Sequence, residues 1–152
     1  TAIDIEETFI DALYYLAKLL SGGVATDKEG TLVDKTDLPS AKKHLLKVLE
    51  MDENHARACY NLGKILSKED KLKEAQKYLV RALKIDPKYS KAHFLLAHVK
   101  EHFKLFDQAT KHFRLAIEFN EENAQAHFRL GVRLYEQEEI KNAKDFVWIF
   151  RG

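Results

Sequence analysis

The feature that most constrains this chain is a repeat with a period of 34 residues. Small residues recur at this interval at Gly63, Ala97 and Gly131. A leucine precedes each of them, and an aromatic residue stands three positions before: Leu62, Leu96, Leu130, Tyr60, Phe94 and Phe128. A second series of alanines keeps the same interval, at Ala41, Ala75, Ala109 and Ala143. Because several columns keep one phase, we predict a chain of similar structural units stacked on one another.

Each unit has the pattern of two amphipathic helices. Apolar or small residues at Cys59, Leu62, Gly63 and Leu66 follow helical spacing and share one face. After the polar stretch 67–71, a second apolar stripe runs from Leu72 to Leu83, and Pro87 ends it because proline cannot continue a helix. Small residues at positions 63 and 75 let the two helix backbones approach closely. The unit is therefore a helix, a short turn and a second helix.

A helix pair of 34 residues with this alternation of small and large residues resembles the tetratricopeptide repeat (TPR). The resemblance implies an all-α fold, a right-handed superhelical solenoid of antiparallel helix pairs with about seven to eight helices, in one domain over residues 1–152. The repeats are expected at about 5–55, 56–89, 90–123 and 124–152, the last one truncated. The first repeat carries an insertion at 22–36, for which we favour a solvated loop, with partner contact as the alternative. Its first helix is expected to turn one stripe inward: Ile5, Phe9, Leu13, Leu16, Ala17 and Leu20.

Composition limits the classes of partner. The 152 residues include 25 Lys and Arg and 24 Asp and Glu, for a net charge of +1, so the excess of positive charge typical of nucleic-acid binding is missing. The sequence has no run of some 18 apolar residues, and its single cysteine, Cys59, cannot form an internal disulfide. We therefore expect no nucleic acid and no membrane as partners, and a cytoplasmic location. The start at Thr1 suggests a piece of a longer protein.

In the TPR family the first helix of each pair lines a concave groove that binds an extended peptide or a helix. Carried over slot by slot, the groove wall of this chain is Asp11, Tyr14, Tyr15, Lys18, Arg57, Tyr60, Asn61, Lys64, Lys91, Phe94, Leu95, His98, Gln125, Phe128, Arg129 and Val132. The candidate peptide-binding residues among them are Tyr14, Tyr15, Lys18, Arg57, Tyr60, Asn61, Lys64, Lys91, Phe94, His98, Phe128 and Arg129. Five wall residues are cationic and only Asp11 is anionic. We infer a non-catalytic scaffold that binds another protein through an acidic segment with apolar anchors.

Two alternatives accompany this interpretation of the wall. In the first alternative, the wall is an ordinary solvated helix face, and its aromatic column serves only to pack adjacent repeats. The second is the carboxylate clamp by which co-chaperone TPR domains hold the C-terminus of Hsp70 or Hsp90. A clamp needs five converging donors, and only Asn61 with Lys91, or Arg129 by itself, agrees with its pattern. A structural module that stacks end to end in a larger assembly is a further alternative.

An enzyme is the remaining hypothesis. Residues 98–102 spell His-x-x-Glu-His, a zinc-peptidase signature with both imidazoles on one helical face. The motif lies inside a predicted repeat helix, and the pattern of that helix already accounts for the spacing of its residues. Catalytic zinc also requires a third protein ligand. We therefore predict no catalytic residues, no metal and no cofactor.

The C-terminal segment is unusual for a repeat end. Residues 146–150, Phe-Val-Trp-Ile-Phe, are apolar around the whole circumference of a helix. Such a segment belongs under a following helix. We expect it to be covered by further chain or by self-association through the C-terminal helix.

Overall fold

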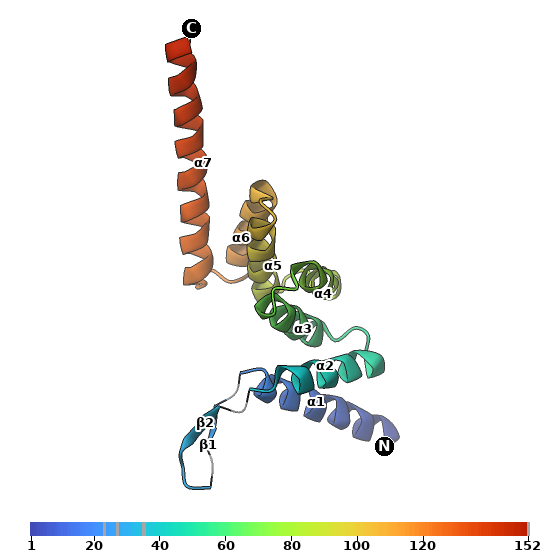
Figure 1. Cartoon of the computed structure of the whole chain (residues 1–152). Helices are drawn as coiled ribbons and strands as arrows, with labels where there is room; N and C mark the ends of the chain where they lie inside the picture. Colours follow the sequence, from blue (N-terminus) through green and yellow to red (C-terminus); the bar gives the residue numbers. More distant parts are fainter. Residues whose placement is uncertain (23, 27, 35, 152) are drawn as a thin grey trace. The chain divides into compact units, whose positions relative to one another are not determined.

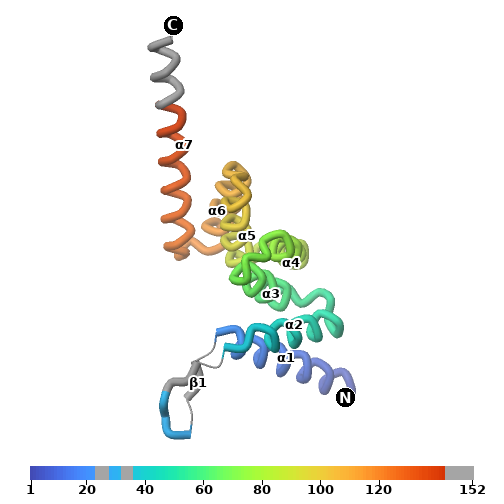
Figure 2. Tube along the Cα trace, in the orientation of Figure 1, coloured from blue at the N-terminus to red at the C-terminus, as the bar shows by residue number. Residues whose placement is uncertain are grey.

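In a computed structural model of the protein, the described residues form seven helices and one small hairpin (Figure 1). The backbone is described at 1–22, 24–26, 28–34 and 36–151, and the side chains at 1–22, 28–31 and 36–142 (Figure 2). The chain divides into two compact units, residues 1–87 and 88–152, called unit 1 and unit 2 below. Unit 1 contains α1 (Ala2–Leu20), β1 (Val24–Thr26), β2 (Leu32–Asp34), α2 (Leu38–Met51), α3 (Ala56–Lys68) and α4 (Leu72–Ile85). Unit 2 contains α5 (Ser90–His102), α6 (Phe106–Phe119) and α7 (Ala124–Arg151).

The turn between paired helices is repeated in the two units. The N–H of Lys71 donates to the carbonyl of Leu66 at 2.9 Å, and 34 residues later the N–H of Leu105 donates to the carbonyl of Lys100 at 2.9 Å. Each turn places one residue in the left-handed region, Asp70 at φ 61° and Lys104 at φ 58°. Left-handed backbone costs a residue with a side chain about 1 to 2 kcal/mol. The packing of the two helices must compensate this cost.

Close helix packing explains the small residues of the repeat. A Cβ atom on Gly63 would lie 2.9 Å from Cγ of Leu79 and 3.3 Å from the carbonyl oxygen of Ala75. Both neighbours belong to α4 and are fully buried. In unit 2 the corresponding cluster is Ala97, Ala109 and Phe113, with Phe94 and Leu130 packed against it. The small residues therefore set the distance between the paired helices.

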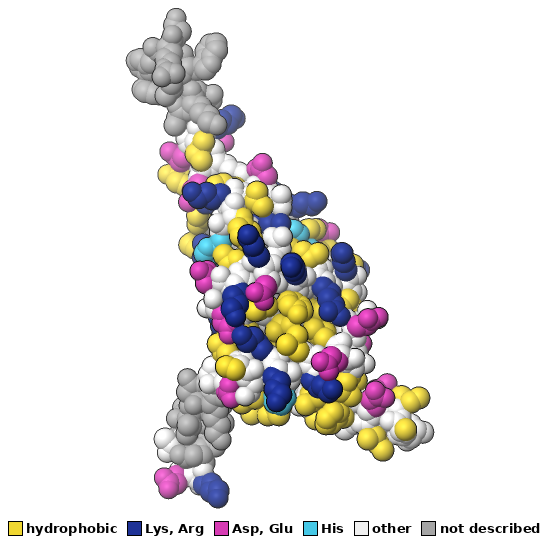
Figure 3. Space-filling model, turned by 45° about the vertical axis from the view of Figure 1, so that its right-hand side comes forward, with side chains coloured by type: hydrophobic (Ala, Val, Ile, Leu, Met, Phe, Trp, Pro, Cys, Tyr) yellow, Lys and Arg dark blue, Asp and Glu magenta, His cyan; other side chains and the backbone are white. Residues whose placement is uncertain are grey.

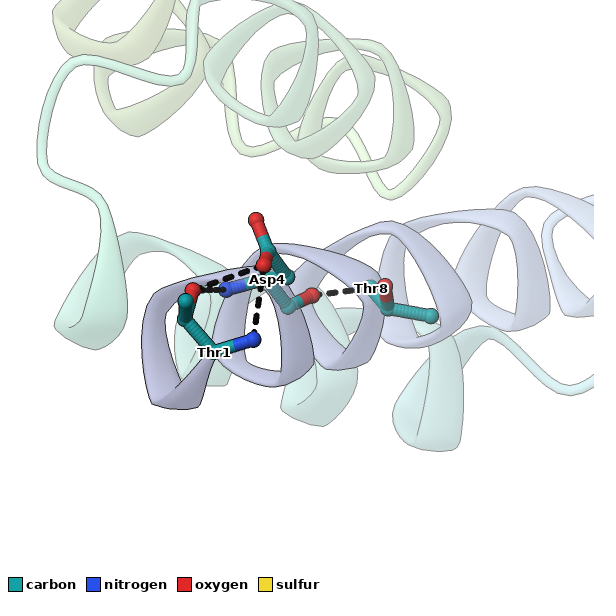
Figure 4. Close-up of polar contacts among 3 residues, drawn as sticks. All are labelled: Thr1, Asp4 and Thr8. Carbon is teal, nitrogen blue, oxygen red and sulfur yellow. Dashed lines mark hydrogen bonds and ion pairs between the residues drawn. The ribbon is translucent and has the colours of Figure 1, made fainter.

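Helix α1 begins with a capping box (Figure 4). The backbone N–H of Asp4 donates to Oγ1 of Thr1 at 3.4 Å, and that hydroxyl donates to Oδ2 of Asp4 at 2.6 Å. The hydroxyl of Thr8 donates to the carbonyl of Asp4 at 2.7 Å. The bond to Thr1 satisfies the N–H of Asp4, one of the first-turn N–H groups that have no carbonyl of an earlier turn to bond with.

The inward face predicted for α1 is partly wrong. Tyr14 and Ala17 are buried, and Leu13 and Leu20 are half-buried, whereas Ile5, Phe9 and Leu16 are exposed. In unit 1, α1 packs on α2, while α3 packs on both α2 and α4. Because α2 is the main neighbour of α1, only the stripe on that side is buried, and the second apolar stripe of α1 stays on the surface.

The insertion at 22–36 contains a hairpin instead of the solvated loop that we favoured. Strands β1 and β2 pair antiparallel, with Val24 opposite Asp34 and Thr26 opposite Leu32. Gly30 adopts φ 80° between them, a conformation that glycine accepts without strain. β-Branched residues in both short strands favour the extended backbone.

The last repeat departs from the helix pair that its pattern indicates. Helix α7 runs without a break from Ala124 to Arg151, although its alanine and isoleucine columns match those of a second helix. The position equivalent to Asp70 and Lys104 is Glu138, within the run Glu136-Gln-Glu-Glu139, whose residues all favour helix. Gly131, in the slot of Gly63, accordingly has nothing within 4 Å of an added Cβ. The side chains of 146–150, for which we expected self-association, lie outside the described residues.

Polar contacts hold the first half of α7 on its neighbours. Nε of Arg133 lies 3.0 Å from Oε1 of Glu101 on α5, and its guanidinium stacks 4.4 Å above the ring of Phe106 on α6. Arg133 also forms an ion pair with Glu136 one turn later. The three helices of unit 2 therefore meet at one arginine.

A histidine pair joins α5 to α6. Nδ1 of His93 and Nδ1 of His112 lie 3.1 Å apart, and the ring of His93 also stacks on Phe119. Burial, with smaller contributions from His93, Lys100 and Lys111, lowers the pKa of His112 to about 4. His112 is therefore neutral at pH 7, and one Nδ1–H donates to the other ring.

We expect Gly63→Val to destabilise the protein by about 1 to 3 kcal/mol, because the new side chain overlaps Leu79 in a packed interface. Gly131→Val is the matched control, since it makes the same change at an open helix position and should cost nothing. Urea unfolding measures both free energies. Equal stabilities of the two variants would contradict the role of Gly63 in helix spacing.

We expect acid to weaken unit 2 through His112. Its folded pKa of about 4 lies below the ordinary histidine pKa of 6.5, so the unfolded chain binds the proton first as the pH falls. Stability is thus constant above pH 6.5 and declines between pH 6.5 and 4. Thermal unfolding across this range should show a shallower decline of Tm for His112→Gln than for the wild type. The exposed His127→Gln control should keep the wild-type slope, and an unchanged slope in His112→Gln would contradict the assignment.

Candidate peptide-binding groove

In unit 1 two of the predicted groove residues are buried and bonded to each other. Tyr14 on α1 and Asn61 on α3 are both buried, and Nδ2 of Asn61 donates to the Tyr14 hydroxyl at 3.1 Å. The same amide nitrogen donates to the carbonyl of Arg57 at 2.8 Å. Both N–H groups of the Asn61 amide are therefore used inside the protein, and the bond ties α1 to α3.

The other candidates of unit 1 are more accessible. Tyr60 is half-buried, and burial, with a smaller contribution from Tyr14, raises the pKa of its hydroxyl. The exposed candidates are one tyrosine and three cations, at Tyr15, Lys18, Arg57 and Lys64. The ring of Tyr15 packs edge-on against Tyr14, with centroids 5.3 Å apart. The surface of unit 1 thus offers positive charge beside an aromatic ring.

In unit 2 four of the candidate peptide-binding residues, and Gln125 of the predicted groove wall, surround one pocket. It has a volume of about 460 Å³ and is lined by Phe94, His98, Ala124, Gln125, Phe128 and Arg129. The pocket lies between α5 and the first turns of α7, so two helices supply its walls. Lys91, the remaining candidate of unit 2, is exposed but does not line the pocket.

The floor of this pocket rests on the core of unit 2. Phe94 packs edge-on against His98 with centroids 4.7 Å apart, and both rings contact the fully buried Phe113, at 5.8 and 5.6 Å. In contrast, the ring of Phe128 is 68% exposed. The pocket therefore combines fixed aromatic walls with one aromatic side chain that is open to a partner.

Charge in the pocket comes from Arg129. Burial, with smaller contributions from the positive charge of Arg129 and from His102, lowers the pKa of His98 to about 4. Nδ1 of His98 lies 3.5 Å from Glu101, but that carboxylate already pairs with Arg133. At pH 7 the pocket thus presents a neutral imidazole and one guanidinium, which favours an anionic ligand group.

The His-x-x-Glu-His motif has no metal-binding geometry in the described residues. Within them, no cluster of three or more histidine, cysteine, aspartate or glutamate side chains is close enough to hold a metal ion. Glu101 is engaged by Arg133, and His102 is exposed. Burial also raises the pKa of the Cys59 thiol, which keeps this cysteine protonated.

Some features of the site were missed by sequence reasoning. Ala124 lines the pocket from the first residue of α7, outside the slots that the family groove supplies. The network of Arg133, Glu101 and Phe106, which holds α7 beside the pocket, was also missed. The sequence contains no local signal for it, because its members come from three helices.

Within the part of the chain that the structure describes, every helix is too short or too polar to cross a membrane.

Comparison with known proteins identifies the fold. Residues 56–89, which contain α3 and α4, match the model of the tetratricopeptide repeat. No curated protein matches the sequence. The structure of MamA is similar, with 23% identity over 88% of this chain and 70% of that chain, and a TM-score of 0.69.

Two other solved structures share the fold. A mutant O-GlcNAc transferase of Thermobaculum terrenum has 21% identity over 85% of this chain, with a TM-score of 0.69, and this chain spans only 22% of its length. The first TPR of Spaghetti (RPAP3), bound to the HSP90 peptide SRMEEVD, has 16% identity over 66% of this chain and 79% of that chain, with a TM-score of 0.62. The seven helices, the repeated turns and the family match agree with the expected all-α repeat fold. Residues 56–89 form a tetratricopeptide repeat, and the chain as a whole shares its fold with tetratricopeptide repeat proteins.

Proposed function

We propose that this protein is a non-catalytic interaction scaffold that binds an acidic segment of another protein. Unit 2 supplies the main subsite, with Arg129 as the charged contact and Phe94 and Phe128 as apolar contacts. Each unit also presents exposed cations that favour an acidic partner, Lys18 and Arg57 in unit 1 and Lys91 in unit 2. The partner class is protein, because a net charge of +1 gives little attraction for a polyanion.

The pocket of about 460 Å³ between α5 and α7 carries this proposal. Its size suits one or two side chains of a peptide, and its walls are mainly apolar with one cation. Because Phe94 and His98 are already held by Phe113, a ligand orders few additional side chains on binding. A preformed site of this kind loses less conformational entropy when it binds.

Structural neighbours support a peptide ligand. The first TPR of Spaghetti (RPAP3) was solved with the peptide SRMEEVD, which contains three acidic residues and the apolar residues Met and Val. This composition matches the chemistry proposed here, an acidic segment with apolar anchors.

The carboxylate clamp is disfavoured for this chain. The amide N–H groups of Asn61 donate to Tyr14 and to the Arg57 carbonyl, so they are not free to hold a C-terminal carboxylate. Leu95 offers no hydrogen-bond donor in its clamp slot, and Gln125 is uncharged where the clamp places a lysine. We therefore propose recognition of acidic side chains along a segment, independent of its C-terminus.

Arg129→Glu is expected to weaken the binding of a fluorescently labelled SRMEEVD peptide by about tenfold or more, because it removes a charge-assisted contact and adds repulsion. Arg114→Glu is the matched control: it makes the same charge change at an exposed site on α6, away from the pocket. Fluorescence anisotropy at two salt concentrations measures both affinities. Equal weakening by both variants would indicate net charge alone, and no weakening by Arg129→Glu would refute the subsite.

The peptide with an amidated C-terminus is expected to bind within about twofold of the free acid, since no clamp holds the terminal carboxylate. The same anisotropy titration on the wild-type protein compares the two peptides. A large loss on amidation would favour the clamp over the groove proposed here.

A further inference from the structure

The second apolar stripe of α1 has the spacing of a helix-pairing seam. Its members alternate at intervals of three and four residues and are all exposed: Ala2, Ile5, Phe9, Ala12, Leu16 and Leu19. We call this stripe the α1 seam. Its four large side chains are between 42% and 73% exposed. Alternating intervals of three and four residues keep side chains on one line, and two such lines pack together in coiled coils.

The same slots on the next repeat are covered. Aligning Tyr14 with Tyr60 makes Ala58, Leu62 and Ile65 of α3 the equivalents of the last three seam positions. These residues are at most 2% exposed, because α3 has helices on both sides. The slots are therefore suited to contact with another helix, and among the described residues of unit 1 no helix covers them on α1.

The seam is accessible from outside the unit. Residues 1–9 are all exposed, and α1 diverges from α2 toward its N-terminus (Figure 1). Along this end the surface is hollowed by about 460 Å³ at Thr1, Asp4, Ile5, Thr8, Phe9 and Ala12. Figure 3 shows hydrophobic side chains next to acidic ones on the projecting end of α1, at the lower right.

We propose that the α1 seam binds the α1 seam of a second copy of this chain, with the two helices antiparallel. In an antiparallel pair Phe9 faces Ala12 of the partner subunit, and Ile5 faces Leu16 of the partner subunit. The same register sets Leu19 against Ala2 of the partner subunit. Each layer then joins a large side chain to a small one or two of middle size, which fills space evenly.

A parallel pair fits less well. It would place Phe9 on Phe9 of the partner subunit and Ala12 on Ala12 of the partner subunit, so that crowded layers alternate with empty ones. It would also align the acidic half of α1, which contains Asp4, Glu6 and Glu7, with the same half of the partner. In the antiparallel pair this half lies beside the end that carries Lys18, and the two helix dipoles oppose each other. Size and charge therefore select the same orientation.

Sedimentation velocity of the wild-type protein without peptide, at about 100 µM, should show a dimer that dissociates on dilution. Phe9→Glu should raise the dissociation constant roughly tenfold or more, because it sets a charge against an apolar layer. Ile3→Glu is the control, since Ile3 is an exposed apolar residue of α1 outside the seam and its substitution should leave the dimer intact. Circular dichroism checks that both variants keep their helices.

Cysteine cross-linking tests the orientation. Under mild oxidation, a Phe9→Cys chain mixed with an Ala12→Cys chain should give a mixed disulfide dimer, while neither chain forms one by itself. The native Cys59 is buried and contributes no background. Efficient cross-linking of Ala12→Cys chains with each other would overturn the antiparallel arrangement. A wild-type monomer, or a dimer insensitive to Phe9→Glu, would overturn the proposal and leave the seam to a helix of another protein; neither result bears on the pocket in unit 2.

Discussion

The close approach of paired helices is the constraint on which the rest of the structure depends. A Cβ atom at Gly63 would overlap Leu79, so the small side chain sets the helix spacing, and that spacing buries the apolar stripes of α3 and α4. The left-handed residues Asp70 and Lys104 allow the second helix of each pair to return along the first. Packing compensates their backbone cost. Where this packing is missing, at Gly131, the backbone continues as one helix.

Some residues of the candidate groove are held by contacts inside the protein, and others are accessible to a ligand. Phe94 and His98 are held by Phe113, and Tyr14 and Asn61 are bonded to each other. Phe128 and Arg129 are exposed at the pocket. The alternative that the aromatic column only packs repeats therefore describes some of its members, while others remain accessible to a ligand. Burial that keeps His98 neutral leaves the charge of the pocket to Arg129.

Much of the fold was predictable because its signal is local. Helix spacing, the polar break at 67–71 and Pro87 together predicted α3 and α4, and the period extended the pattern to α5 and α6. The candidate site was predictable only as a set of slots. Whether a slot such as that of Asn61 faces a ligand or a neighbouring side chain depends on contacts between helices far apart in the sequence. A single sequence carries no signal for those contacts.

The sequence by itself determined the type of unit, its length and its small-residue positions, because these follow from periodicity and from the steric limits of single residues. Only the tertiary structure decided which stripe of α1 is buried, that α7 is continuous, and that Arg133 joins three helices. The physical reason is that an apolar stripe in the sequence indicates that burial is favourable but does not specify the element that buries it. Which neighbour covers it, and whether one is present at all, is settled by the packing of the whole chain.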